Sequence, residues 1–127
     1  MSTLKLDTIL HSSGSTTTEP SIPALDQRMA KAWVNFSAGG TVNGSFNVSS
    51  VTDEGSANYT ANLATAMPNE DFVCVGSTQF ANRDTTVHVY GRATAAYRTT
   101  TSQRVRITTN GSATDPVDDV QLIIFSS

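Results

Sequence analysis

Carboxylates are the side chains of this chain best suited to acid–base or metal chemistry, and six of the eleven occur as three neighbouring pairs. Adjacent residues of a strand point to opposite faces, so a pair of this kind does not form the facing dyad of a glycosidase. Each pair also lies beside residues typical of turns, which favours capping of the turn over binding of calcium. The pairs are Asp53-Glu54, Glu70-Asp71 and Asp118-Asp119.

The other reactive side chains are isolated. His11 lies in a polar segment and His88 in a predicted strand, with no third ligand at a spacing typical of a zinc site. Cys74 lies in the apolar run FVCV and is predicted to be a small buried hydrophobe rather than a nucleophile. Ser and Thr are abundant, but no GxSxG nucleophile elbow is present. The sequence therefore predicts a protein that is not an enzyme and that has neither a metal nor a cofactor.

The composition limits the class of partner. The net charge is −3 and only 15% of the 127 residues are charged, whereas a surface that binds nucleic acid needs clustered Lys and Arg. Arg104 and Arg106 lie two residues apart, and we expect both on one solvated strand face. No segment approaches the ~20 apolar residues of a membrane span. We therefore expect no nucleic-acid partner and no membrane insertion.

The stretch from Gln79 to Arg98 contains side chains suited to binding sugars or the edges of other proteins. It combines aromatic rings with planar hydrogen-bonding groups, which are frequent at recognition surfaces. An ordinary solvated sheet with long loops would have a similar composition, so both interpretations stay open. The candidate residues for surface binding are Phe80, Arg83, His88, Tyr90, Arg92, Tyr97 and Arg98.

Strands must position most of these residues, because the apolar pattern from Lys31 onward has a period of two. In each segment one alternating set of residues is apolar and is predicted to face the core. Trp33 falls out of step with its apolar neighbours and is predicted to lie on the opposite face. The predicted core-facing sets are Val34 and Phe36, then Phe46 and Val48, then Tyr59, Ala61 and Leu63.

Residues typical of turns separate these strands. They occur at 38–40, 43–44, 53–55 and 67–69. The segment 120–125 is apolar at nearly every position, which is typical of a central strand or of one covered by a neighbouring subunit. Residues 32–127 are therefore predicted to form an all-β domain, an antiparallel β-sandwich or jelly roll of about seven or eight strands. The later strands are predicted at 72–78, 86–90, 103–108 and 120–125.

Residues 1–31 differ in character and are predicted to form an extended N-terminal arm. A stretch of almost pure Ser, Thr and Gly follows its first apolar residues, and two prolines then interrupt regular pairing. Residues 25–33, LDQRMAKAW, are the only plausible helix. The apolar start of the arm is either a frayed terminus or a docking strand that adds to another protein. The residues predicted to serve assembly are Leu4, Leu6, Ile9 and Trp33.

Several segments resemble the small tail-fibre-like virion proteins of bacteriophages. AWVNF at 32–36 is followed at 40–73 by GTVNGSFNVSSVTDEGSANYTANLATAMPNEDFV. These segments are similar, in order, to the family's AWVNF block, SFNVSSIT strand, Asp and Gly turn, YTVNF-type strand and AMPD-type turn. The opening MSTLKLDTIL and the closing TDPVDDVQLIIF also resemble the family. The match is poor between Ser77 and Gly111, where loops would vary to suit different contacts.

The resemblance implies a non-enzymatic virion protein, rich in β-structure, that is made in the host cytoplasm and assembles as a homotrimer. Other virion proteins of the tail, neck or capsid would hold it through its arm, and host surface glycans are candidate ligands. Long fibres need shaft repeats, which this chain lacks, so a capsid decoration or cement protein that bridges capsid subunits is a second hypothesis. A small carbohydrate-active enzyme is a third, and it would require turnover that is lost on mutation of one carboxylate.

Overall fold

The alternating apolar pattern produces strands throughout the body of the protein. The computed structural model describes residues 6, 8, 10, 12–14, 28–79, 85–91, 96–113 and 118–126. In these residues the only helical element is the 3-10 turn η1 (Ala38–Gly40). The strands are β1 (Ala32–Ser37), β2 (Thr41–Phe46), β3 (Val48–Gly55), β4 (Asn58–Leu63), β5 (Val73–Gln79), β6 (Thr85–Val89), β7 (Arg98–Thr99), β8 (Ser102–Thr109), β9 (Ser112–Ala113) and β10 (Asp119–Phe125).

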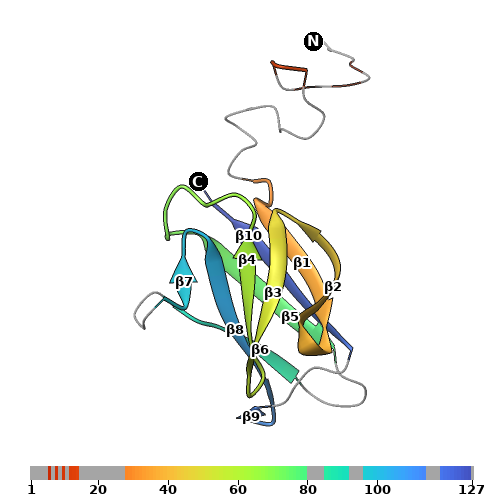
Figure 1. Cartoon of the computed structure of the whole chain (residues 1–127), viewed down its shortest axis with the longest axis vertical. Helices are drawn as coiled ribbons and strands as arrows, with labels where there is room; N and C mark the ends of the chain where they lie inside the picture. The colour runs from red at the N-terminus through yellow and green to blue at the C-terminus, as the bar shows by residue number, and fades with distance from the viewer. Residues whose placement is uncertain are drawn as a thin grey trace, which may run out of the picture.

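The strands form two antiparallel sheets that lie face to face as a sandwich (Figure 1). The four-stranded sheet A has the order β2-β1-β10-β5, and the six-stranded sheet B has the order β3-β4-β8-β6 with β7 and β9 also paired to β8. The predicted all-β sandwich is therefore confirmed. The prediction of a central strand at 120–125 is also confirmed, because β10 pairs with β1 on one side and β5 on the other.

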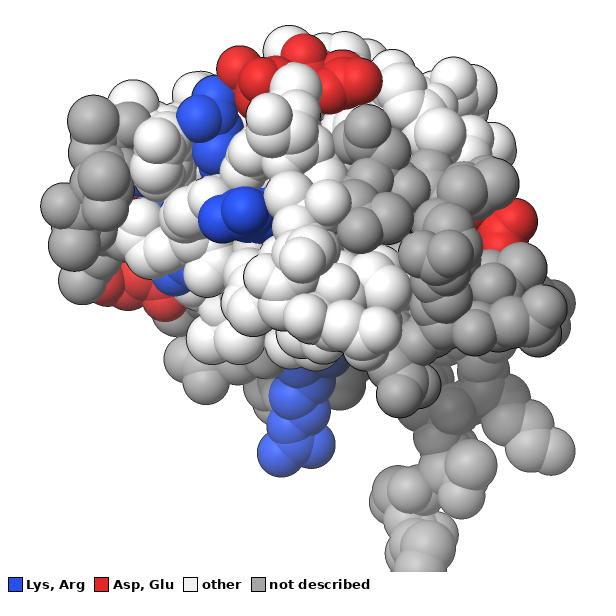
Figure 2. All heavy atoms as spheres, turned by 90° about the horizontal axis from the view of Figure 1, so that it is seen from below, with Lys and Arg blue, Asp and Glu red and all other residues white. Residues whose placement is uncertain are grey.

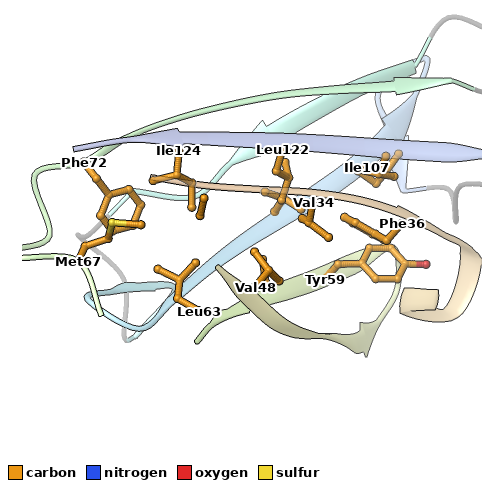
Figure 3. Close-up of a cluster of buried hydrophobic side chains, with 14 of the residues drawn as sticks. Val34, Phe36, Val48, Tyr59, Leu63, Met67, Phe72, Ile107, Leu122 and Ile124 are labelled. Carbon is orange, nitrogen blue, oxygen red and sulfur yellow. The ribbon is translucent and has the colours of Figure 1, made fainter. Parts of the chain in front are cut away.

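The core lies between the sheets and is built from alternate residues of each strand. Phe36 of sheet A and Tyr59 of sheet B are both fully buried, and their ring centroids are 5.2 Å apart. Side chains of β1 and β10 point toward those of β3 and β4 across this space (Figure 3). Tyr59, Ala61 and Leu63 are buried as the period of two predicts, and so are Val34 and Phe36.

Asn47 turns the chain from sheet A into sheet B. The prediction that Phe46 and Val48 share one face of one strand is therefore wrong: Phe46 ends β2 in sheet A, and Val48 begins β3 in sheet B. Asn47 has a φ of 54°, a left-handed conformation that Asn tolerates better than most residues. Its side-chain amide donates to the carbonyl oxygens of Lys31 (3.0 Å) and Thr65 (3.2 Å).

The turn expected at Asn43-Gly44 does not form, since both residues lie within β2. Gly44 pairs with Asn35 where the register of β1 and β2 shifts. A Cβ atom at Gly44 would lie 3.5 Å from the Trp33 ring. This is an ordinary van der Waals distance, so Gly44 lies beside the Trp33 ring as a residue of β2 and not in a turn.

The helix predicted at 25–33 is wrong over its described part. Residues 28–31 form a turn and bend, and Ala32 and Trp33 already belong to β1; residues 25–27 lie outside the described residues. The amide of Lys31 donates to the carbonyl of Ile124 (2.7 Å), so pairing with β10 begins there. A helix this short is marginal alone, whereas the sheet satisfies the backbone and buries Ala32.

Candidate functional surfaces

The stretch predicted to bind surfaces is only partly within the described residues. Phe80, Arg83 and Arg92 lie outside them. The structure brings Tyr90 and Tyr97 together and gives Arg98 a separate environment. The same holds for the predicted assembly residues: Leu4 and Ile9 lie outside the described part of the chain, Leu6 is exposed, and Trp33 lies on β1.

Tyr90, Tyr97, Arg104 and Asn58 form a cluster, here called the tyrosine cluster, on the outer face of sheet B. The ring centroids of Tyr90 and Tyr97 are 4.8 Å apart and tilted by 52°. The guanidinium of Arg104 lies 4.5 Å from the Tyr97 centroid, within the range of a cation–π contact. The Tyr90 hydroxyl donates to Asn58 Oδ1 (3.0 Å). The cluster therefore combines two half-buried aromatic rings with polar groups in fixed positions.

An ion pair extends this cluster toward the β3–β4 turn. Arg104 Nη2 lies 2.8 Å from Glu54 Oε2, and Thr60 Oγ1 donates to Glu54 Oε1 (2.8 Å). The hydrogen bond from Thr60, and then the contact with Arg104, lower the pKa of the Glu54 carboxyl below its ordinary value. Acidic and basic side chains lie near each other among uncharged atoms on the face drawn in Figure 2.

Asp53 caps the turn beside that ion pair, as the sequence predicts. Its Oδ1 accepts a hydrogen bond from the amide of Gly55 (2.8 Å), which has a φ of 77°. Asn69 Oδ1 accepts from the amide of Asp71 in the same way (2.8 Å), so Asn69 caps that turn. Both contacts are the local side-chain turns that Asp and Asn favour.

His88 lies on the same outer face, paired in register with Arg106. It is exposed, and its Nε2 lies 2.9 Å from Thr108 Oγ1. Within the described ranges, no group of three or more His, Cys, Asp or Glu could hold a metal ion. His88 therefore adds a polar ring beside the arginines.

The side chain of Arg98 bonds to other groups of the protein. Its Nε donates to Gln103 Oε1 (2.7 Å), and its Nη1 donates to the carbonyl of Phe72 (3.0 Å). The guanidinium also lies 4.7 Å from the Phe72 centroid. Gln103 is fully buried, so Arg98 donates the hydrogen bond that the buried amide oxygen of Gln103 requires.

Cys74 packs against the core as a half-buried side chain. Burial raises the pKa of its thiol to about 11, against a smaller opposing effect of Arg98. The thiolate, which is the reactive form, is therefore rare at neutral pH. This environment is that of a small hydrophobe.

The outer face of sheet A contains an exposed line of apolar side chains. The register pairs Phe46 with Trp33, Trp33 with Ile123, and Ile123 with Val75. These four residues are here called the apolar row. They are between 39% and 58% exposed, with Phe46 at the lower and Val75 at the upper end. Trp33 thus lies opposite the buried Val34 and Phe36, as predicted.

Sequence analysis identified one member of the apolar row and missed the other three. Trp33 stands out because it is out of step with its apolar neighbours. Phe46, Ile123 and Val75 come from three other strands, and only the pairing of those strands aligns them. A search for apolar residues at the outward positions of every predicted strand would have raised Ile123 and Val75 as candidates.

The fold places this chain in the class of all-β sandwich proteins. Comparisons with known protein families, with curated proteins and with solved structures find no match. Over the described residues, no helix has the length and apolar character to cross a bilayer. Inferences about function therefore rest on the surfaces described above and on the sequence resemblance.

Proposed function

We propose that this protein is a non-enzymatic structural protein of a phage virion, a fibre-type appendage that assembles as a homotrimer. Residues 1–31 attach it to other virion proteins, and the sandwich is exposed on the particle. The observation that carries the proposal is the exposed apolar row on sheet A, which includes Trp33 of the AWVNF block. Exposed apolar patches on a soluble domain mark surfaces that other proteins cover.

The opposite face of the sandwich supports a role in contact with the host. The tyrosine cluster offers aromatic rings beside Asn, Glu and Arg groups, which suit weak binding of surface glycans. Weak sites act together when many copies are present on one particle, so a deep pocket is not required. The sheet A face serves assembly in this proposal, and the sheet B face serves adhesion.

Counting copies in purified particles tests the proposal. We expect mass spectrometry of purified virions to detect the chain at a few to a few dozen copies per particle, and antibody labelling to place it on an appendage. Hundreds of copies spread over the capsid would instead identify a decoration or cement protein. Absence from purified particles would contradict both.

Adhesion is tested separately with the recombinant full chain. Binding to host cells should fall when cell-surface glycans are oxidised with periodate and when Tyr97→Ala removes one ring of the cluster. Thr86→Ala, at an exposed position of β6 on the same sheet, is the matched control and should bind normally. Equal binding by all three proteins, unaffected by periodate, would contradict a glycan-binding role for this face.

A further inference from the structure

The apolar row crosses the whole of sheet A in a line perpendicular to its strands. Its members come one from each strand, in the order Phe46, Trp33, Ile123, Val75. With neighbouring strands ~4.8 Å apart, the row spans about 15 Å. Val73, 59% exposed, is paired with Phe125 on the next outward positions of β5 and β10 and extends the row toward one end of the sheet.

The outer face of sheet B provides a comparison, because it has the polar residues expected of a sheet face that meets solvent. Its outward positions on β3 and β4 are polar and bond to one another: Asn62 donates to Ser50 Oγ (3.0 Å) and Thr52 Oγ1 (2.9 Å). One face of an antiparallel sheet commonly meets solvent in this way, with polar residues outward. The apolar row departs from that pattern within the same domain.

The size of the apolar surface suits the centre of an interface. The exposed parts of these side chains amount to on the order of 400 Å², within the range of the largest patch on a typical monomer. A stable interface buries about 800 Å² on each partner, with an apolar centre and a polar rim. The next outward positions, Asn35, Gln121 and Ser77, are paired in register and would supply such a rim.

The chemistry of the face favours a second copy of this chain as the occupant. In an isologous interface both subunits use the same surface patch, and residue i of one meets residue j of the other, so the side chains of the patch must be able to pair with one another. Apolar groups and amides such as Asn35 and Gln121 can do so, since an amide both donates and accepts. Asp119 is the only charged residue among the described outward strand positions of sheet A, and it receives a hydrogen bond from Asn43 (3.3 Å).

We propose that the outer face of sheet A packs against the same face of further copies of this chain, with the apolar row at the centre of the contact. This names the surface of the homo-oligomer in the proposed function and rests on that proposal for its setting. The covered row would remove Trp33 from water. It would leave the tyrosine cluster, on the opposite face, free in every copy.

Trp33 is the single tryptophan of the chain, so its fluorescence reports directly on this face. We expect light scattering of the full chain to give the mass of a dimer or trimer. Tryptophan emission should be blue-shifted at high concentration and move to the red on dilution, as subunits separate. A monomeric mass with red emission at every concentration would overturn the proposal.

Val75→Asp places a charge at the most exposed position of the row, and Thr86→Asp places the same charge at an exposed position of β6 on sheet B. The first should be monomeric with red emission, and the second should match the wild type. Should Val75→Asp fail to fold, Ile123→Thr keeps a β-branched residue and should raise the dissociation constant at least about tenfold. Unchanged association in the folded row variant would overturn the proposal.

A chain lacking residues 2–27 separates this contact from one made by the arm. Retention of the oligomer supports packing of sheet A on sheet A, whereas a monomer would show that the arm makes the contact between subunits and would overturn the proposal. The outcomes also separate the two proposals. A virion component that is monomeric in solution refutes the sheet A contact and the homotrimer but leaves the virion role, and an oligomer absent from purified particles refutes only the virion role.

Discussion

At the scale of single residues, Gln103 is the buried polar group on which sheet B depends. Its Nε2 donates to the carbonyls of Tyr90 (2.9 Å) and Arg104 (2.7 Å), and its Oε1 accepts from Arg98 (2.7 Å). A buried amide is tolerated because both of its ends are satisfied. Arg98 is therefore better explained by the needs of Gln103 than by binding at the surface.

Removing Arg98 should destabilise the protein. Arg98→Ala leaves Gln103 Oε1 buried without this donor and is expected to lower the free energy of unfolding by about 2–3 kcal/mol. Arg104→Ala, which breaks a partly exposed ion pair, should cost about 1 kcal/mol or less. Urea denaturation of the two variants measures the difference, and equal losses would contradict the role assigned to Arg98.

The pKa of Glu54 should respond to its two partners. Thr60→Val and Arg104→Gln each remove an interaction with the charged carboxylate, so each should raise the pKa of Glu54 toward its ordinary value of 4.5. Carbon-13 NMR titration of the carboxyl measures the change. Thr52→Val, two residues before Glu54 on β3 and without a bond to Glu54 among those described, is the control and should leave this pKa unchanged.

The lowered pKa also fixes the sign of the pH dependence. The folded state holds the Glu54 proton less tightly than the unfolded chain, so its contribution is fully present above the ordinary pKa and is lost as pH falls through the folded value. Glu54 is partly exposed, so this contribution should stay below about 1 kcal/mol. Greater stability of the wild type at pH 3 than at pH 6, arising from this group, would contradict the assignment.

At the scale of elements, the corner at Asn47 separates β2 in sheet A from β3 in sheet B, which would otherwise form one continuous strand. Besides its two donated bonds, Asn47 Oδ1 accepts from the amide of Thr65 (2.7 Å). These bonds connect the β2–β3 corner to the segments before β1 and after β4. One residue therefore fixes both the change of sheet and the position of two flanking segments.

Two substitutions separate the two properties of Asn47. Asn47→Gly loses the side-chain bonds but keeps access to a positive φ, whereas Asn47→Ala loses the bonds and also meets the left-handed strain. We expect Asn47→Ala to be less stable than Asn47→Gly by about 1 kcal/mol, and both to be less stable than the wild type. Thermal and urea unfolding measure the order. An alanine variant at least as stable as the glycine variant would contradict the strain argument.

At the scale of the whole molecule, the two outer faces of the sandwich differ in chemistry. Sheet A presents the apolar row, and sheet B presents the tyrosine cluster and polar ladders. One domain can then use one face for assembly while the other stays in water. The shared core between the sheets holds the two faces in a fixed relation.

The body should fold without most of the arm. Every buried hydrophobic residue of the described core cluster lies between Ala32 and Ile124. A chain of residues 28–127 is therefore expected to keep its β-type circular dichroism and an unfolding midpoint in urea close to that of the full chain under conditions where both are monomeric. Loss of cooperative unfolding on truncation would show that the arm contributes to the core.

Local patterns predicted the later strands of the body well, including the strand at 120–125, which is apolar at nearly every position. The strands at 73–79, 85–89, 102–109 and 119–125 lie within one or two residues of their predicted bounds. Predictions failed where pairing between distant segments overrides local preference. The residues from Lys31 onward pair with β10 instead of forming a helix. The chain turns at Asn47 rather than at Gly44.

The sequence by itself determined that the body is all-β, which residues of β1 and β4 face the core, and that Trp33 faces away from it, because these depend on the alternation of side chains along one strand. The tertiary structure alone decided which outward residues become neighbours. Trp33 meets Phe46, Ile123 and Val75 only through the register of four strands. The physical reason is that side-chain direction is a local property of the backbone, whereas a surface is formed by hydrogen-bonded pairing between segments far apart in the chain.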